Sequence, residues 1–140
     1  MVYLDTSFVV AALTNEANSA AAQQWLEQQQ PETLCISDWV MTEVSSALAI
    51  KLRAGQIESD ERADALAAFS RLCIETFNIE PVSRRHFRLA ADLVNQTAFL
   101  LRAADALHLA ICSEIGASLS SFDRRQRDAA PVLGIKLELL

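Results

Sequence analysis

The chain has 140 residues, 51% of them hydrophobic, and a formal net charge of -6. This length suits one hydrophobic core, so we expect residues 1–140 to form a single domain. The longest uninterrupted apolar run, residues 8–13, is far too short to span a bilayer, and residues 1–13 lack the basic start of a secretory signal. The sequence therefore predicts a soluble, cytoplasmic protein and argues against a membrane protein.

Short β-favouring segments alternate with longer segments of helical periodicity, and Pro31, Gly55, Gly116 and Pro131 mark the ends of elements. In chain order we expect a strand at 2–4, helices at 7–13 and 18–30, a strand at 34–36, helices at 39–54 and 59–74, a strand at 77–79, helices at 83–96 and 102–115, a strand at 117–121, a short helix after 123 and a strand at 135–139. This alternation predicts a three-layer α/β fold with a central, mostly parallel sheet. Ligands of such folds bind outside the carboxyl ends of the strands.

The charge is unevenly distributed along the chain. Residues 1–80 hold 12 acidic and 4 basic side chains, whereas residues 81–140 hold 6 and 8. An acidic protein is an unusual nucleic-acid binder, but the late basic residues offer two clusters that can meet phosphates. These clusters are Arg84, Arg85 and Arg88, and Arg124, Arg125 and Arg127. A solvated helix face is the alternative interpretation, above all for the first cluster.

The cysteines do not suggest a covalent framework. Cys35, Cys73 and Cys112 are odd in number, widely spaced and surrounded by apolar residues. This pattern favours reduced thiols in the core over disulfides or a zinc site.

Two aspartates follow predicted strands. Asp5 ends the apolar segment at 2–4, and Asp123 follows the segment at 117–121. Both therefore belong to the sheet edge where α/β proteins place their chemistry. Each is also a good helix N-cap, and either taken alone has that simpler explanation.

Two further acids lie on helix faces that should be buried. Glu43 falls between Val40 and Ala47, on the arc that the helix turns toward the core. Asp105 lies in a segment, 103–112, that is apolar nearly all round, where an unpaired carboxylate is expensive. Both acids are hard to explain without a metal ion or a partner group.

The four acids can converge on one cleft if the strands that precede Asp5 and Asp123 are neighbours. At an effective dielectric of about 20, two unit charges about 4 Å apart repel by roughly 4 kcal/mol, so such a cluster calls for a cation. Ligation by oxygen alone selects Mg²⁺ or Mn²⁺ over zinc or copper. His86 and His108 lie on different helices, and we expect His108 to be a core or supporting residue rather than a ligand.

Four segments carry a resemblance to a known family. They are YLDTS at 3–7, TEVSSAL at 42–48, RAADALHLA at 102–110 and SFDRR at 121–125. In this order and spacing they resemble the PIN-domain family, and most closely its bacterial VapC-type toxins. The likeness covers essentially the whole chain.

The resemblance implies a metal-dependent endoribonuclease whose catalytic acids are Asp5, Glu43, Asp105 and Asp123. It implies that Asp5, Asp105 and Asp123 hold Mg²⁺, or Mn²⁺, partly through water, and that Glu43 is a ligand or orients water. Ser7 and Ser121 match hydroxyl positions near the first and last acids. The resemblance also implies a homodimer and a small antitoxin protein that blocks the cleft.

Two other protein classes and one non-catalytic role are the alternatives to this function. A phosphotransferase of the haloacid dehalogenase type needs a second aspartate where this chain has Ser7. A response-regulator receiver needs an early acidic pair and a late lysine, which the chain lacks in the expected places. A catalytically inert PIN-like module that only binds partners is the alternative that stays open.

Overall fold

The computed structural model describes residues 1–138 and contains one parallel sheet. Its strands are β1 (Val2–Leu4), β2 (Leu34–Ser37), β3 (Asn78–Glu80) and β4 (Ser118–Ser120). They lie in the order β3-β2-β1-β4, and every neighbouring pair is parallel. The register pairs Leu4 with Ser120, so β1 and β4 end side by side.

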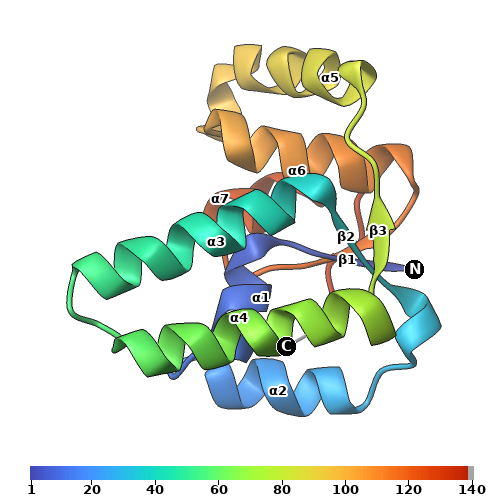
Figure 1. The fold of residues 1–140 in the computed structure, drawn as a ribbon. Coiled ribbons are helices and arrows are strands. Elements are labelled where there is room, and N and C mark those ends of the chain that lie inside the picture. Colours follow the sequence, from blue (N-terminus) through green and yellow to red (C-terminus); the bar gives the residue numbers. More distant parts are fainter. Residues whose placement is uncertain (139–140) are drawn as a thin grey trace.

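Helices cover both faces of this sheet (Figure 1). They are α1 (Thr6–Leu13), α2 (Ser19–Glu27), α3 (Asp38–Arg53), α4 (Ser59–Glu75), α5 (Arg84–Asn95), α6 (Ala103–Glu114) and α7 (Arg124–Ala129), with short 3₁₀ turns η1 (Pro31–Thr33) and η2 (Thr97–Phe99). In Figure 1, α5 and α6 lie above the sheet, and α1, α2 and α4 lie below it. The predicted three-layer α/β fold with a parallel sheet is confirmed. No helix in the described part of the chain combines the length and apolarity that a membrane span requires.

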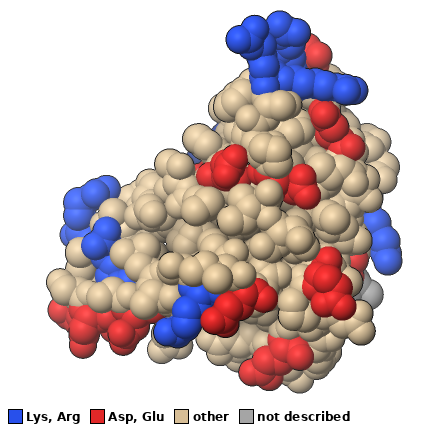
Figure 2. Space-filling view, turned by 45° about the vertical axis from the view of Figure 1, so that its right-hand side comes forward, with Lys and Arg blue, Asp and Glu red and all other residues tan. Residues whose placement is uncertain are grey.

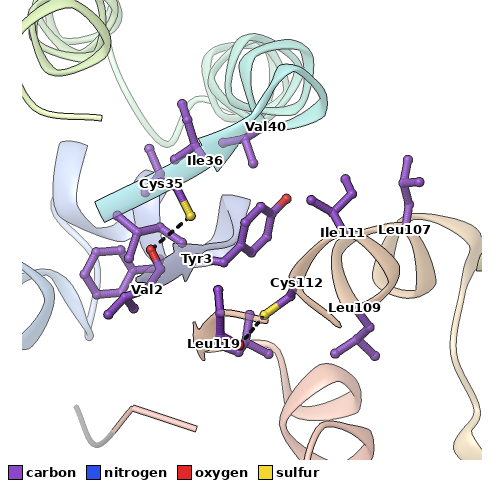
Figure 3. Close-up of a cluster of buried hydrophobic side chains, with 14 of the residues drawn as sticks. Val2, Tyr3, Cys35, Ile36, Val40, Leu107, Leu109, Ile111, Cys112 and Leu119 are labelled. Carbon is purple, nitrogen blue, oxygen red and sulfur yellow. Dashed lines mark hydrogen bonds between the residues drawn. The ribbon is translucent and has the colours of Figure 1, made fainter. Parts of the chain in front are cut away.

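One part of the core lies between the sheet and α6, and Phe8, Val9 and Phe69, from α1 and α4, belong to the part on the opposite face. Every residue of α6 from Asp105 to Cys112 is buried, because this helix lies between the sheet and α5. Figure 3 shows side chains of β1, β2, β4 and α6 meeting in this core. The thiols of Cys35 and Cys112 donate to backbone carbonyls here, and burial raises the pKa of each to about 12. All three cysteines are free, and Cys35 and Cys112 lie in the core as predicted, whereas Cys73 is only partly buried.

The predicted elements differ from the observed ones mainly at their ends. The second helix stops at Glu27 rather than at residue 30, because Gln30 precedes Pro31 and is extended, with ψ 127. The third strand begins one residue later than expected, at Asn78. These shifts leave the order of elements unchanged.

The predicted strand at 135–139 is wrong over the residues that the structure describes; Leu139 lies outside them. Only Leu137 forms a bridge, which is parallel to Leu119 of β4. Leu119 N–H donates to the carbonyl of Lys136, and Glu138 N–H donates to the carbonyl of Leu119. The chain thus touches the edge of a three-residue strand at one point, although its alternating pattern favours a strand.

Candidate active site

A cleft of about 320 Å³ opens at the carboxyl ends of β1 and β4. It is lined by all the acids singled out from the sequence, which are Asp5, Glu43, Asp105 and Asp123. They meet because β1 and β4 are adjacent and parallel, and Asp5 N–H donates to the carbonyl of Ser120 at 3.2 Å. The adjacency on which the predicted convergence depended is therefore present.

Asp5 is the most buried of these acids, with 1% of its surface exposed. It caps α1, and its Oδ1 accepts hydrogen bonds from Phe8 N–H (3.0 Å) and Ser7 Oγ (2.8 Å). Burial raises the pKa of Asp5 above its ordinary value, although His108 and these hydrogen bonds act in the opposite direction. Its N-cap role and its place in the cleft coexist.

Asp123 repeats this arrangement at the end of β4. It caps α7, and its Oδ1 accepts from Gln126 N–H at 3.0 Å. The same Gln126 reaches across the cleft floor, where its Nε2 donates to Asp5 Oδ2 at 3.0 Å. Ser7 Oγ accepts from Phe122 N–H at 2.9 Å, so side chains as well as the backbone join the ends of the two strands.

Asp105 lies in the first turn of α6 and is 9% exposed. Its Oδ2 accepts from Arg102 N–H at 3.0 Å, which satisfies one of the free amides at the start of the helix. The position is therefore less anomalous than the apolar segment suggested. The carboxylate reaches the cleft from the N-terminal end of a buried helix.

Glu43 enters the cleft from the second turn of α3, and 22% of its side chain is exposed. Its Oε2 accepts from Thr6 Oγ1 and from His108 Nε2, the latter at 2.6 Å. Burial alone would raise the pKa of Glu43, but the hydrogen bond and charge of His108, together with Thr6, outweigh it. The pKa of Glu43 is therefore lowered from its ordinary value.

The acids Asp5, Glu43, Asp105 and Asp123 have little positive charge near them, whereas a fifth acid of the cleft lining, Glu16, pairs with Lys51 at 2.8 Å. Within residues 1–138, neither Lys nor Arg forms an ion pair with any of these four acids. Over the same residues, no group of three or more His, Cys, Asp or Glu side chains is close enough to hold an ion directly. The oxygen donors suit Mg²⁺, which keeps several waters and binds through one or two carboxylates, better than a metal that needs a complete protein cage.

The two basic clusters lie in different surroundings. Arg84, Arg85 and Arg88 are exposed on α5 and none lines the cleft, which favours a solvated helix face. Figure 2 shows the corresponding blue group at the top of the molecule. The second cluster begins at Arg124, directly after Asp123 of the cleft.

Sequence reasoning missed three residues that organise the site. Thr6 and Gln126 hold acids of the cleft, and Tyr3 contacts His108 from the core. Thr6 directly follows Asp5 in the sequence, so its position could have identified it as a residue of the site. Gln126 and Tyr3 gave none, because their partners are 121 and 105 residues away in the chain.

A parallel α/β domain with four carboxylates around one cleft at its strand ends has the architecture of a PIN domain. The family model of the PIN domain matches residues 2–131. This chain belongs to the PIN-domain family.

Known proteins place it near the VapC ribonucleases. Ribonuclease VapC46 of Mycobacterium tuberculosis is 30% identical over 138 residues, which cover 96% of this chain and 93% of that protein. The structure of VapC20, a sarcin-ricin loop cleaving toxin of M. tuberculosis, has a TM-score of 0.73 at 20% identity and covers 92% of this chain and 95% of its own. A toxin-antitoxin complex from Klebsiella pneumoniae has a TM-score of 0.65 at 21% identity, covering 96% and 95%. The two structural likenesses establish the fold.

Proposed function

We propose that this protein is a metal-dependent endoribonuclease and the toxin of a toxin-antitoxin pair, acting in the cytoplasm. One observation carries the proposal: Asp5, Glu43, Asp105 and Asp123 come from separate elements to line one cleft, and no Lys or Arg of residues 1–138 pairs with these four, although Lys51 pairs with Glu16 at the same cleft. The likeness to ribonuclease VapC46 over nearly the whole chain supports RNA as the substrate.

In this proposal Asp5, Asp105 and Asp123 hold Mg²⁺ or Mn²⁺. A carboxylate has about four lone-pair sites, and three of those on Asp5 already accept hydrogen bonds. The remaining site, on Oδ2, suits one bond to an ion or to its water. When bound, the ion would activate a water and neutralise charge on the phosphate.

The protein's own residues would orient and retain these groups. Backbone amides at the starts of α1, α6 and α7 hold the three aspartates, and Ser7 and Gln126 fix the carboxylate plane of Asp5. Glu43 forms another wall of the cleft, where it is a further ligand of the ion or orients water. Arg124, exposed beside the cleft, is placed to meet the RNA backbone.

We propose two protein partners. A second copy of this chain forms a homodimer, and an antitoxin blocks the cleft with a basic side chain, for which the unpaired carboxylates are suitable acceptors. The likeness to a structure described as a toxin-antitoxin complex supports the second partner. Co-purification of the protein of a short reading frame immediately upstream tests it.

The function is tested on purified, antitoxin-free protein. The protein is incubated with total RNA in Mg²⁺, in Mn²⁺ and in chelator, and the new RNA ends are mapped. Cuts that appear only with metal support the proposal. Absence of metal-dependent cuts across the whole RNA pool contradicts it and favours a catalytically inert partner-binding module.

A further inference from the structure

A chain of hydrogen bonds runs from the cleft into the core of the protein. Glu43 Oε2 contacts His108 Nε2 at 2.6 Å, and His108 Nδ1 contacts the Tyr3 hydroxyl at 2.9 Å. The Tyr3 hydroxyl contacts Ser37 Oγ at 2.8 Å. The members come from α3, α6, β1 and β2, so the sheet and two helices together fix the position of Glu43.

The hydrogen-bonded residues Ser37, Tyr3 and His108 lie in apolar surroundings. Figure 3 shows Tyr3 among Cys35, Ile36, Ile111 and Cys112, and His108 is 2% exposed. Burying a polar group costs folding free energy unless the group forms a hydrogen bond. Here Ser37, Tyr3 and His108 each have one, and the chain ends on a carboxylate at the cleft wall.

The geometry also fixes which nitrogen of the imidazole faces Glu43 with a proton. An ionised carboxylate only accepts hydrogen bonds, so His108 Nε2 carries a hydrogen. Nδ1 can then accept from Tyr3, which in turn accepts from Ser37, and every group is satisfied. A hydrogen-bond partner on the far nitrogen is the usual way to hold an imidazole in one tautomer and one orientation.

The two oxygens of Glu43 have different environments. Oε2 receives both His108 and Thr6. Oε1 accepts no hydrogen bond of full geometry from residues 1–138. The Trp39 side chain is near enough to help lower the pKa of Glu43, and its buried Nε1 lacks a hydrogen-bond partner among those residues. Because Glu43 lines the cleft, Oε1 is the oxygen left for a water molecule there.

The aspartates of the cleft are held differently. Asp5, Asp105 and Asp123 each accept from a backbone amide at a helix start. Among residues 1–138, Glu43 accepts hydrogen bonds only from side chains, which are Thr6 and the buried imidazole of His108.

We propose that His108, supported by Tyr3 and Ser37, is a positioning residue that holds Glu43 with Oε1 toward the cleft, where Glu43 orients the attacking water rather than binding the divalent ion. The inference rests on the proposed ribonuclease function and assigns to Glu43 one of the two roles left open by the sequence. It makes His108 necessary for turnover and unnecessary for metal binding.

The experiment compares variants of the full chain in metal affinity and in steady-state cleavage. Calorimetric titration with Mn²⁺ gives the affinity, and cleavage of an RNA cut by the wild type gives kcat and KM. His108→Ala should lower kcat by about 10–100-fold, the usual effect of losing a residue that orients a functional side chain, with KM and Mn²⁺ affinity changed less than about twofold. His108→Gln, whose amide can reach toward Glu43, should recover part of kcat, and Tyr3→Phe should lose less than His108→Ala.

Two variants serve as references. His86→Gln is the matched control, because His86 is also buried but contacts Ser83 and Glu114 instead of the cleft, so kcat should stay at the wild-type value. Asp105→Asn should weaken Mn²⁺ binding strongly. If His108→Ala weakens Mn²⁺ binding as much as Asp105→Asn, Glu43 is a metal ligand and the inference is wrong. An unchanged kcat in folded His108→Ala also overturns it.

A spectroscopic readout separates this inference from the ribonuclease proposal. Nitrogen-15 NMR of the imidazole should show a proton on His108 Nε2, and Tyr3→Phe should shift the Nδ1 resonance. A proton on Nδ1 alone contradicts the inference whatever the activity. If the wild type cleaves no RNA, the proposed function fails, and the NMR and Mn²⁺ data still decide whether Glu43 is held as described.

Discussion

The cleft combines two ways of holding a carboxylate. Asp5, Asp105 and Asp123, which we call the amide-held acids, lie at the starts of α1, α6 and α7 and accept from backbone N–H groups. Glu43, the imidazole-held acid, depends on His108 and Thr6. Backbone amides stabilise a carboxylate without bringing a counter-charge, so the amide-held acids still call for a cation, whereas Glu43 accepts hydrogen bonds from an imidazole and a hydroxyl.

The difference explains why capping and function are not competing interpretations of these aspartates. An acid at a helix start gains roughly 0.3–1 kcal/mol from the helix dipole and satisfies a free amide. The same helix starts converge on the strand ends where the cleft opens. The fold therefore offsets part of the cost of concentrating negative charge there.

The largest expected effect is loss of cleavage when an amide-held acid is neutralised. Asp5→Asn and Asp105→Asn should each lower kcat/KM by about 10²–10³-fold or more, because the ion that would neutralise charge in the transition state loses a ligand. The fold should persist: the oxygen of the introduced amide can still accept from Phe8 or Arg102, and in Asp5→Asn the unpartnered Oε1 of Gln126 can turn to accept from the new side chain. Metal-dependent thermal stabilisation should disappear together with cleavage.

Asp128→Asn is the matched control for these variants. Asp128 is exposed on α7 and, among residues 1–138, pairs only with Arg124, so its neutralisation should leave both readouts at wild-type values. Undiminished cleavage by folded Asp5→Asn or Asp105→Asn would remove that acid from the proposed site.

A smaller effect is expected at Gln126, which connects two amide-held acids. Gln126→Leu removes the donor to the buried Asp5 Oδ2, which should lower the unfolding free energy by about 1–3 kcal/mol. Part of this loss is regained, because the variant also removes Gln126 Oε1, a buried atom without a partner among residues 1–138. Urea unfolding in chelator measures it, with Gln29→Leu, which loses a bond to a backbone carbonyl, as the control. An equal loss in an Asp5→Asn background would show that Gln126 and Asp5 are not coupled.

Much of this architecture is readable from local sequence pattern. The alternation of short strands and helices is a local property, and it predicted the order of elements and the three-layer fold. Asp5 and Asp123 were identifiable because each ends a short apolar segment, and Glu43 because it interrupts an apolar helix face.

The remainder depends on contacts between distant residues. The adjacency of β1 and β4 decides whether Asp5 and Asp123 meet, and no local pattern encodes it. The bonds of Gln126 to Asp5 and of Tyr3 to His108 join residues more than 100 positions apart. At the C-terminus, an alternating pattern favoured a strand, but only Leu137 bridges β4, because period-two alternation reports a half-buried segment without requiring a paired one.

Asp5 and Glu43 should also respond oppositely to pH. The pKa of Asp5 is raised by burial from its ordinary 3.8, so its contribution to stability is present below that value and is lost as pH rises through the folded pKa. The pKa of Glu43 is lowered from 4.5, so its contribution is present above that value and is lost as pH falls through the folded pKa.

Unfolding free energies in chelator from about pH 3 to about pH 7 test this contrast. As pH rises, Asp5→Asn should gain stability relative to wild type. Over the acidic end of the range, Glu43→Gln should instead lose stability relative to wild type as pH rises. Parallel pH profiles for the two variants would contradict this contrast between the buried Asp5 and Glu43.

The smallest effect is expected outside both groups, at Arg124. Its side chain is 93% exposed and its pair with Asp128 spans 3.6 Å, so the ion pair should contribute little to folding. Arg124→Ala should therefore leave the melting temperature and Mn²⁺ affinity unchanged. If Arg124 meets an RNA phosphate, the variant should reduce the slope of log KM against log salt by about 0.7, the release expected per contact on a single strand. Arg85→Ala, on the solvated face of α5 away from the cleft, should leave that slope intact, and equal slopes in all three proteins would place the RNA path elsewhere.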